Sequence, residues 1–424
     1  MTAIHDPNYG MRPEVELLLG CARVHIDSAR VARISALLQE DLNWNYLLRM
    51  ASQHGMMPLL YWHLKSIHPD AVPKATLDQL HGHFYNNARY NLLLTGALLK
   101  LLKLLETHKI PAIPYKGPAL AVSVYGNLAL RQFGDLDIVI RKQDILKVKD
   151  LLLSEGYRAE YQLTPAQETA FLQMGHAYSF SRQANAVHVE IHYQIFPSYL
   201  AFPLDLDVLW ERLEPLSLAG NTVLNLAPGD LLLILCVHGA KHQWERLEWI
   251  CGIAEMLRIH QGMDWNRIMQ QATLVSNKRA LLLGLLLASN LLDAPVPPQV
   301  LQEAQGDSVV KMLAAQVQAR LPEESHRLAK NGELSELARS LLFYFRLRAS
   351  LSDRIGYVVR CFQLLATPSV SDWTLIPLPD PLFPLYYLIR PSRQVGKHGR
   401  ALLRIVQQAP GWLRYRLCPP DKRP

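Results

Sequence analysis

Apolar residues recur along the chain with two different periods, and the changes of period divide it into three parts. The first part has helical spacing, which predicts helices over 13–23, 28–40, 43–53, 56–67 and 75–108. The last of these carries leucines on more than one face, as a central packing element does. Its polar residues Arg89 and Asn91 are predicted to be exposed, because such side chains usually are.

The middle part, residues 109–200, mixes short strand patterns with short helical ones. Gly134 to Ile140 predicts a buried strand, because its apolar residues are β-branched and alternate with two acids. The predicted elements are strand 110–115, helix 118–124, strand 134–140, helix 142–155, strand 157–161, helix 165–173 and strands 177–181 and 187–194. From Pro228 the spacing is helical again to about residue 365, and six prolines in 366–391 exclude a continuous helix there.

These patterns predict an α+β fold that is helical over most of its length. We expect an N-terminal helical region over 13–108, a core over 109–200, a C-terminal helical region over 201–365, and a Pro-rich segment with a basic tail over 366–424. Half of the 424 residues are hydrophobic, so the chain is long enough for two or three packed units.

Positive charge is concentrated at the carboxyl end of the chain. The formal net charge is +7, but residues 389–424 contain nine Lys or Arg and one acid, so the rest sums to −1. The basic pI therefore does not imply a protein that coats nucleic acid over its whole surface. Residues 390–424 fit either an amphipathic segment on an anionic membrane or nucleic acid, or a helix packed on the core with a solvated basic face.

Cysteine spacing and hydropathy restrict the compartment. Five cysteines without paired spacing predict neither a zinc site nor a disulfide framework, which favours a reducing cytoplasm. The first apolar run follows acidic residues, unlike a secretory signal. The longest apolar run, within 280–292, falls short of the roughly 18 residues of a membrane span. We expect a cytoplasmic protein without a transmembrane segment, peripheral to the inner membrane if its tail binds lipid.

Two acids on one strand are the first candidate for chemistry. Asp135 and Asp137 are two residues apart, so the strand period places both carboxylates on one face, roughly 7 Å apart at their Cα atoms. Like charges at this separation repel each other unless a cation lies between them. A divalent metal ion is the usual cation, and the pair therefore predicts a metal site.

A second candidate precedes the strand, at Lys116-Gly117. The glycine follows a predicted strand and opens a predicted helix whose first backbone N–H groups are an anion site. Lys116 would add a point charge beside them. A plain turn with a solvated lysine is the alternative, and we favour phosphate contact because the acidic strand comes next.

Together, Lys116-Gly117, Arg131, Asp135, Asp137 and a later acid, Glu190, resemble the nucleotidyltransferase superfamily typified by DNA polymerase beta. They are most similar to its bacterial branch of uncharacterised nucleotidyltransferases, and the resemblance extends from about Trp44 to Arg390. Two positions depart from that pattern. Pro118 replaces a small hydroxyl residue after the turn glycine, and Cys251-Gly252 stands where an Asp tends to follow the Trp.

The resemblance implies a polymerase-beta-like core with a small mixed sheet, flanked by helical regions. It implies transfer of a nucleoside monophosphate from an NTP, with ATP the first expectation, to an acceptor hydroxyl on a protein, small molecule or RNA. Asp135, Asp137 and Glu190 would be catalytic and would hold Mg²⁺ or Mn²⁺. The nucleotide would be bound by Lys116, Gly117, Arg131, Lys241 and His242.

Other histidines and a second pair of acids have weaker claims to these roles. His188 and His192 share a strand face with Glu190, and we interpret both as structural. His238 and His242 have metal-ligand spacing but no acid between them. A second Asp-x-Asp, at 205–207, precedes a helical pattern, so Asp205 is interpreted as a helix N-cap.

Two other classes of function remain open. One is a nucleotide-binding or assembly protein that has lost turnover, which the departures at Pro118 and Gly252 favour. The other is a membrane-surface or nucleic-acid binder that acts through residues 390–424.

Overall fold

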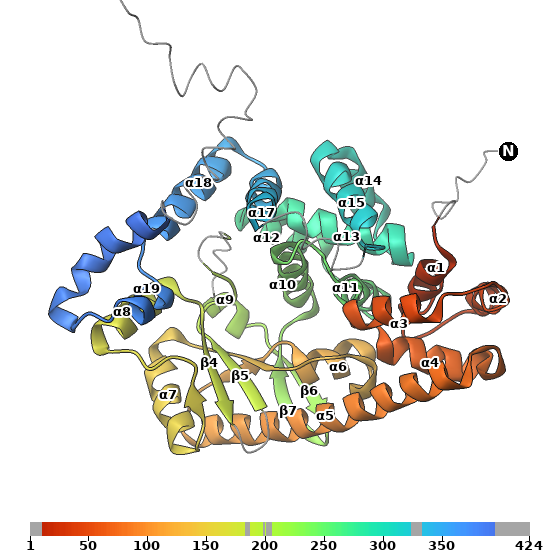
Figure 1. The fold of residues 1–424 in the computed structure, drawn as a ribbon, viewed down its shortest axis with the longest axis horizontal. Helices are drawn as coiled ribbons and strands as arrows, with labels where there is room; N and C mark the ends of the chain where they lie inside the picture. Colours follow the sequence, from red (N-terminus) through yellow and green to blue (C-terminus); the bar gives the residue numbers. More distant parts are fainter. Residues whose placement is uncertain (1–10, 183–186, 198–199, 201–205, 324–332, 395–424) are drawn as a thin grey trace, which may run out of the picture.

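The computed structural model describes residues 11–182, 187–197, 200, 206–323 and 333–394; for residues 333–338 it describes the backbone alone. Figure 1 shows helices packed above and around a small mixed sheet, which confirms the expected α+β class. Asp205 lies outside the described residues, whereas Asp207 lies in α9 and pairs with Arg141. In the part of the chain that is described, no helix is long and apolar enough to cross a membrane.

The N-terminal helices follow their predicted spacing closely. They are α1 (Pro13–Gly20), α2 (Ser28–Leu37), α3 (Trp44–Gln53), α4 (Met57–Ile67) and the long α5 (Lys74–Thr107). Two of these helices have an N-cap side chain that accepts a hydrogen bond from a backbone N–H group: Asp27 in α2 and Asn43 in α3. Short polar residues favour this position because they satisfy the free donors of the first turn.

One prediction for α5 was wrong. Arg89 is exposed as expected, but Asn91 is fully buried, and its amide donates to the carbonyls of Leu128 and Arg131 at 2.6 and 2.8 Å. These two bonds satisfy the donor group of the buried amide, as buried polar groups generally require. Asn91 therefore ties α5 to the segment just before the acidic strand.

The sheet has five strands in the order β1-β2-β5-β4-β3. The strands are β1 (Ala112–Pro114), β2 (Leu136–Ile140), β3 (Arg158–Ala159), β4 (Ala177–Arg182) and β5 (Val187–His192). β2 pairs with β5 in parallel and the other pairs are antiparallel. Between the strands lie α6 (Gly117–Tyr125), α7 (Ile145–Ser154) and α8 (Pro165–Met174). Every residue of β2 is buried, as its β-branched sequence predicts.

A hairpin that the sequence analysis did not predict completes this part of the fold. It consists of β6 (Glu214–Leu218) and β7 (Asn221–Asn225), joined by Ala219 and Gly220 with φ of 48° and 78°. Two successive positive φ values define the tight hairpin turn that Asn-Gly usually forms, so Ala-Gly gave a weak signal. Leu218 and Val223 pack into the same core as the sheet.

Two large hydrophobic cores hold together most of the chain that the structure describes. The smaller one contains the sheet, α7 and the second half of α5, which runs along the sheet in Figure 1. The larger one joins α1–α4 to the helices of the second half. Those helices are α9 (Leu206–Trp210), α10 (Pro228–Lys241), α11 (Leu247–Ile259), α12 (Trp265–Leu274), α13 (Lys278–Leu292), α14 (Pro298–Gly306), α15 (Ser308–Arg320) and α17 (Glu333–Leu347). The helices α18 (Leu351–Ala366) and α19 (Val370–Leu375) follow them and lie outside the larger core. The expected N- and C-terminal helical regions thus share one core.

Asp307, the N-cap of α15, gives a pH-dependent contribution to stability. Its carboxylate accepts from the backbone N–H groups of Val309 and Val310 and pairs with Arg279 at 2.7 Å. Burial raises the pKa of Asp307, but these bonds outweigh it and hold the pKa below its ordinary value. A depressed folded pKa stabilises the fold above the unfolded value of about 3.9, and this contribution is lost as pH falls through the folded pKa.

We therefore expect Asp307→Asn to lower the melting temperature at pH 7 and to have a smaller effect near pH 3, below the unfolded pKa, because part of the contribution of the charge is lost there. Asparagine keeps the cap, so only the charge is tested, whereas Asp307→Ala also loses the cap and should cost about 1 kcal/mol more than Asp307→Asn at both pH values. Thermal unfolding of the three proteins across this range measures the difference. An Asn effect that persists unchanged at pH 3 would contradict the assignment.

Candidate active site

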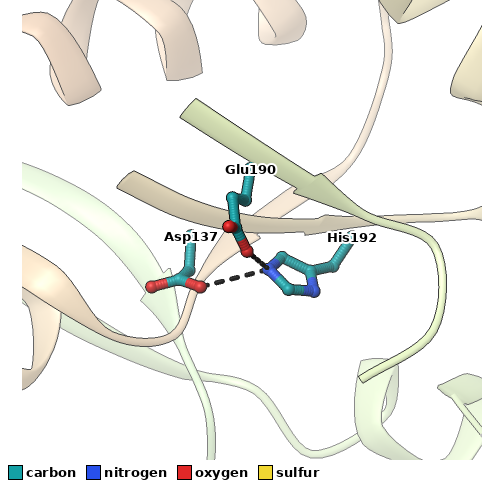
Figure 2. A group of neighbouring side chains, drawn as sticks. All are labelled: Asp137, Glu190 and His192. Carbon is teal, nitrogen blue, oxygen red and sulfur yellow. Dashed lines mark hydrogen bonds and ion pairs between the residues drawn. The ribbon is translucent and has the colours of Figure 1, made fainter. Parts of the chain in front are cut away.

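Parallel pairing of β2 and β5 brings two carboxylates together. Asp137 on β2 is the register partner of Glu190 on β5. His192, two residues further on β5, places Nε2 3.1 Å from Asp137 Oδ1 and 3.2 Å from Glu190 Oε2 (Figure 2). One ligand atom from each of the three lies within 4.8 Å of the others. Asp137 is 5% exposed, whereas the Glu190 side chain is 40% exposed, so the group opens toward Glu190.

The donors of this group fit a divalent metal ion. Carboxylate oxygens are the ligands that Mg²⁺ and Mn²⁺ prefer, and an imidazole nitrogen suits Mn²⁺ as well as softer ions. His192 is buried, and among the described residues its Nδ1 has no hydrogen-bond partner. The ring is therefore held by its bonds to the two carboxylates.

The charges around Asp137 keep it ionised. Burial raises the pKa of Asp137, but Lys116, whose Nζ lies 3.3 Å from Oδ1, and the hydrogen bond from His192 lower it far more, to well below its usual range. Asp135 differs. It lies just before β2, and burial together with the charge of Asp137 raises its pKa. The two predicted metal ligands therefore have different electrostatic surroundings, which sequence spacing alone did not show.

Backbone geometry explains the glycine of the predicted phosphate turn. Lys116 is the N-cap of α6, and Gly117 is its first residue with φ of 52°. A Cβ at Gly117 would lie 3.3 Å from the carbonyl oxygen of Asp135. The turn therefore lies directly against the start of the acidic strand. Pro118 occupies the first turn of α6, where it offers no N–H to an anion.

We expect Gly117→Ala to lower both stability and nucleotide binding. A left-handed conformation costs a non-glycine residue roughly 1–2 kcal/mol, and the close Asp135 carbonyl adds a contact that must shift. Gly126→Ala, at the other end of α6, is the matched control, since Gly126 has φ of 65° but nothing within 4 Å of its Cβ. Melting temperature and nucleotide titration of both variants are measured. Equal losses of nucleotide binding would show that the approach to Asp135 is irrelevant.

Arg131 lies between the turn and the strand. Asn87 and Asn91 on α5 both donate to its carbonyl oxygen. Its Nη1 is buried and has no hydrogen-bond partner among the described residues. Its charge is one of the influences that act to lower the pKa of Asp135. Arg131, which the sequence predicts to bind phosphate, thus lies beside the acidic strand and has a donor, Nη1, without a partner among the described residues.

The end of α10 carries the remaining predicted residues. Lys241 is its last residue and His242 its C-cap. Burial and the charge of Lys116 lower the pKa of Lys241. Burial, and to a smaller extent the charges of Lys241 and Lys116, lower the pKa of His242 to about 4. These effects place the end of α10 in the electrostatic field of Lys116. His242 also packs on the ring of Trp249, with centroids 5.0 Å apart.

A buried tryptophan holds this end of the helix. Trp244 follows α10 with φ of 56° and is 1% exposed. A Cβ on Gly239 would lie 2.4 Å from its ring, and one on Gly284 of α13 would lie 2.9 Å from it. Only glycines at these two positions leave room for the indole, which packs between α10 and α13.

The contact of His192 with both carboxylates was not predicted from the sequence. His192 was interpreted as structural, yet it contacts both carboxylates, while His188 on the same face is exposed. The signal was present, because a period of two places His192 beside Glu190. A lone histidine on a strand does not show which residue of a neighbouring strand it will meet.

Comparisons with known proteins identify the family of the chain. A search of curated proteins found no match. A solved structure, the crystal structure of an antigenic nucleotidyltransferase-like protein from Paracoccidioides brasiliensis, is 19% identical, covers 49% of this chain and 93% of that chain, and superposes with a TM-score of 0.29. Residues 40–293, more than half of the chain, match the family described as "Uncharacterised nucleotidyltransferase". The chain therefore belongs to this family of nucleotidyltransferases.

Proposed function

We propose that the protein is a metal-dependent nucleotidyltransferase that transfers a nucleoside monophosphate from an NTP, ATP first among them, to an acceptor hydroxyl. The observation that carries the proposal is the pairing of Asp137 with Glu190 beside His192, opposite Lys116 at the start of a helix. Carboxylates that share a site beside a phosphate-binding turn are the arrangement that phosphoryl transfer requires.

The metal site consists of Asp137 and Glu190, with His192 as a further donor and Asp135 beside it. A Mg²⁺ or Mn²⁺ ion bound there would supply Lewis-acid stabilisation of the charge that develops on the phosphoryl oxygens. The pKa of Asp137 is low, so this residue offers a charged ligand at any physiological pH.

The phosphates are bound by the turn and the residues around it. Lys116 and the backbone N–H groups at the start of α6 face the triphosphate, and Arg131 contributes its unpaired Nη1. Lys241 and His242 approach from α10. Because burial and Lys116 lower the pKa of Lys241, an added polyanion restores a favourable environment for its charge.

Glu190 acts on the acceptor side. It is the more exposed carboxylate, and a hydrogen bond from His192 lowers its pKa, so it is ionised and can accept a proton. A new bond forms between the acceptor oxygen and the α-phosphorus, the bond to the β-phosphate breaks, and pyrophosphate leaves with that electron pair. The acceptor proton passes to Glu190.

Labelling tests the proposal. The purified full chain is incubated with Mg²⁺ or Mn²⁺ and each α-labelled NTP, first alone and then with a cell lysate, and the labelled product is isolated. We expect a label that depends on the metal and on Asp137. If the metal-loaded protein binds no NTP and labels nothing, the proposed function is wrong.

Two observations favour the second candidate, a protein that binds nucleotide without turnover. Lys116 and His192 already compensate the charge of Asp137, and Pro118 removes one N–H from the phosphate turn. Calorimetric titration with ATP and Mn²⁺ separates the two cases. Binding without label in any acceptor mixture would identify the nucleotide-binding protein.

A further inference from the structure

Exposed apolar side chains are concentrated near the carboxyl end of the described chain. Of the 26 exposed large hydrophobic residues in the described ranges, 15 lie within residues 341–388. On the surface of a monomeric protein, exposed apolar side chains are usually scattered singly. A large cluster of them marks a surface that binds another molecule or a membrane. This concentration therefore needs an occupant.

The centre of this surface is α18, whose apolar face points outward. Its exposed stripe lies within an arc of about 120° at 3.6 residues per turn and consists of Leu351, Ile355, Val358, Val359, Phe362 and Leu365. Ile355 is 57% and Phe362 67% exposed. Tyr357, on the other side of the helix, is buried and packs toward Tyr344 of α17. An ordinary surface helix has the opposite orientation.

The segment after α18 continues this surface and is firmly held. Leu375, Leu382, Leu385 and Leu388 are exposed, whereas Trp373 and Tyr386 are buried in a small core with α8. Asp372 is fully buried and pairs with Arg390 at 3.1 Å and with Arg393. The apolar side chains are thus displayed on an ordered support, at the edge of the molecule where α18 and α19 lie in Figure 1.

Charge identifies the occupant. Residues 339–424 contain 14 Lys or Arg and four acids, which gives a formal charge of +10. Residues 1–338 contain 30 Lys or Arg and 33 acids, which gives −3. Arg354 flanks the α18 stripe. Aliphatic side chains offer little to RNA, which is bound through stacking and phosphate contacts. A second copy would bring a like charge to the same face, which disfavours self-association.

We propose that α18 and residues 375–388, the lipid face, dock on an anionic membrane surface. The aliphatic side chains enter the boundary between headgroups and acyl chains, and Arg354 beside the stripe stays at the headgroup level, where it is attracted to the anionic surface. The docking surface is independent of the nucleotidyltransferase site, so its test does not use activity.

Sedimentation of the full-length protein with vesicles tests the lipid face. Vesicles of phosphatidylcholine with one part in four phosphatidylglycerol are compared with pure phosphatidylcholine at low and moderate salt. We expect binding to the anionic vesicles that weakens with salt. The double variant Ile355→Ser/Phe362→Ser should bind about tenfold or more weakly, because both side chains would lose their apolar burial.

The matched control is Leu92→Ser/Leu274→Ser, which removes two leucines 61% and 74% exposed on α5 and α12. It should bind as the parent does, and melting temperatures verify that both double variants fold. A truncation that lacks residues 395–424 should bind more weakly and remain sensitive to Ile355→Ser/Phe362→Ser.

Three results would overturn the proposal. The first is that the parent does not bind anionic vesicles at low salt. The second is that Ile355→Ser/Phe362→Ser binds as the parent does while the truncation abolishes binding, which would assign the attachment to the tail alone. The third is a concentration-dependent dimer in analytical ultracentrifugation that this double variant dissociates, which would make a second copy the occupant.

Discussion

Asp137→Asn is expected to lower nucleotidyl transfer by about three orders of magnitude or more, because metal stabilisation of the transition state is worth several kcal/mol. Asparagine has nearly the same volume but lacks the charge that binds the cation. Metal affinity should fall with the rate. Titration of Mn²⁺ binding by electron paramagnetic resonance and single-turnover transfer from labelled NTP measure the two effects.

The fold should survive this substitution. Asp137 is held by Lys116 and His192, and Lys116 can turn toward solvent when its partner loses its charge. The exposed Asp150→Asn on α7 is the control for charge loss alone. Asp135→Asn should also reduce metal-dependent binding. If Asp137→Asn binds Mn²⁺ and transfers like the parent, the carboxylate pair is a structural ion-pair network and the proposed function fails.

Glu190→Gln is expected to reduce kcat by about 10²- to 10³-fold while NTP affinity changes by only about threefold, since a general base acts in the transition state and contributes about this much. Glu190 is more exposed than Asp137 and His192, and its substitution leaves the contacts of Asp137 with Lys116 and His192 in place. Steady-state kinetics together with NTP titration separate the two quantities.

The exposed Glu40→Gln, far along the chain from the sheet, is the control. A loss of NTP affinity as large as the loss of kcat would place Glu190 among the phosphate-side metal ligands instead of at the acceptor. Unchanged kinetics would remove it from the reaction altogether.

Local signals in the sequence were sufficient for most elements. The helices α1–α5 and the strand β2 follow from the period of their apolar residues, and the turn at Gly117 follows from its position between a strand and a helix. The β6–β7 hairpin was missed because its turn is Ala-Gly instead of a residue pair with a strong preference. The burial of Asn91 was missed because its partners are carbonyl groups 37 and 40 residues away.

The sequence by itself determined that this chain has an Asp-Leu-Asp strand after a Lys-Gly turn, since both depend on neighbours a few residues apart. Only the tertiary structure decided which later residues meet that strand. His192 contacts Asp137 across 55 residues of chain, and Glu190 lies beside Asp137 because β2 and β5 pair in parallel in one register. A shift of that register by one residue would turn Glu190 and His192 to the other face. The pairing is selected by burial of both strands in a common core, which is a property of the whole fold and of no single segment.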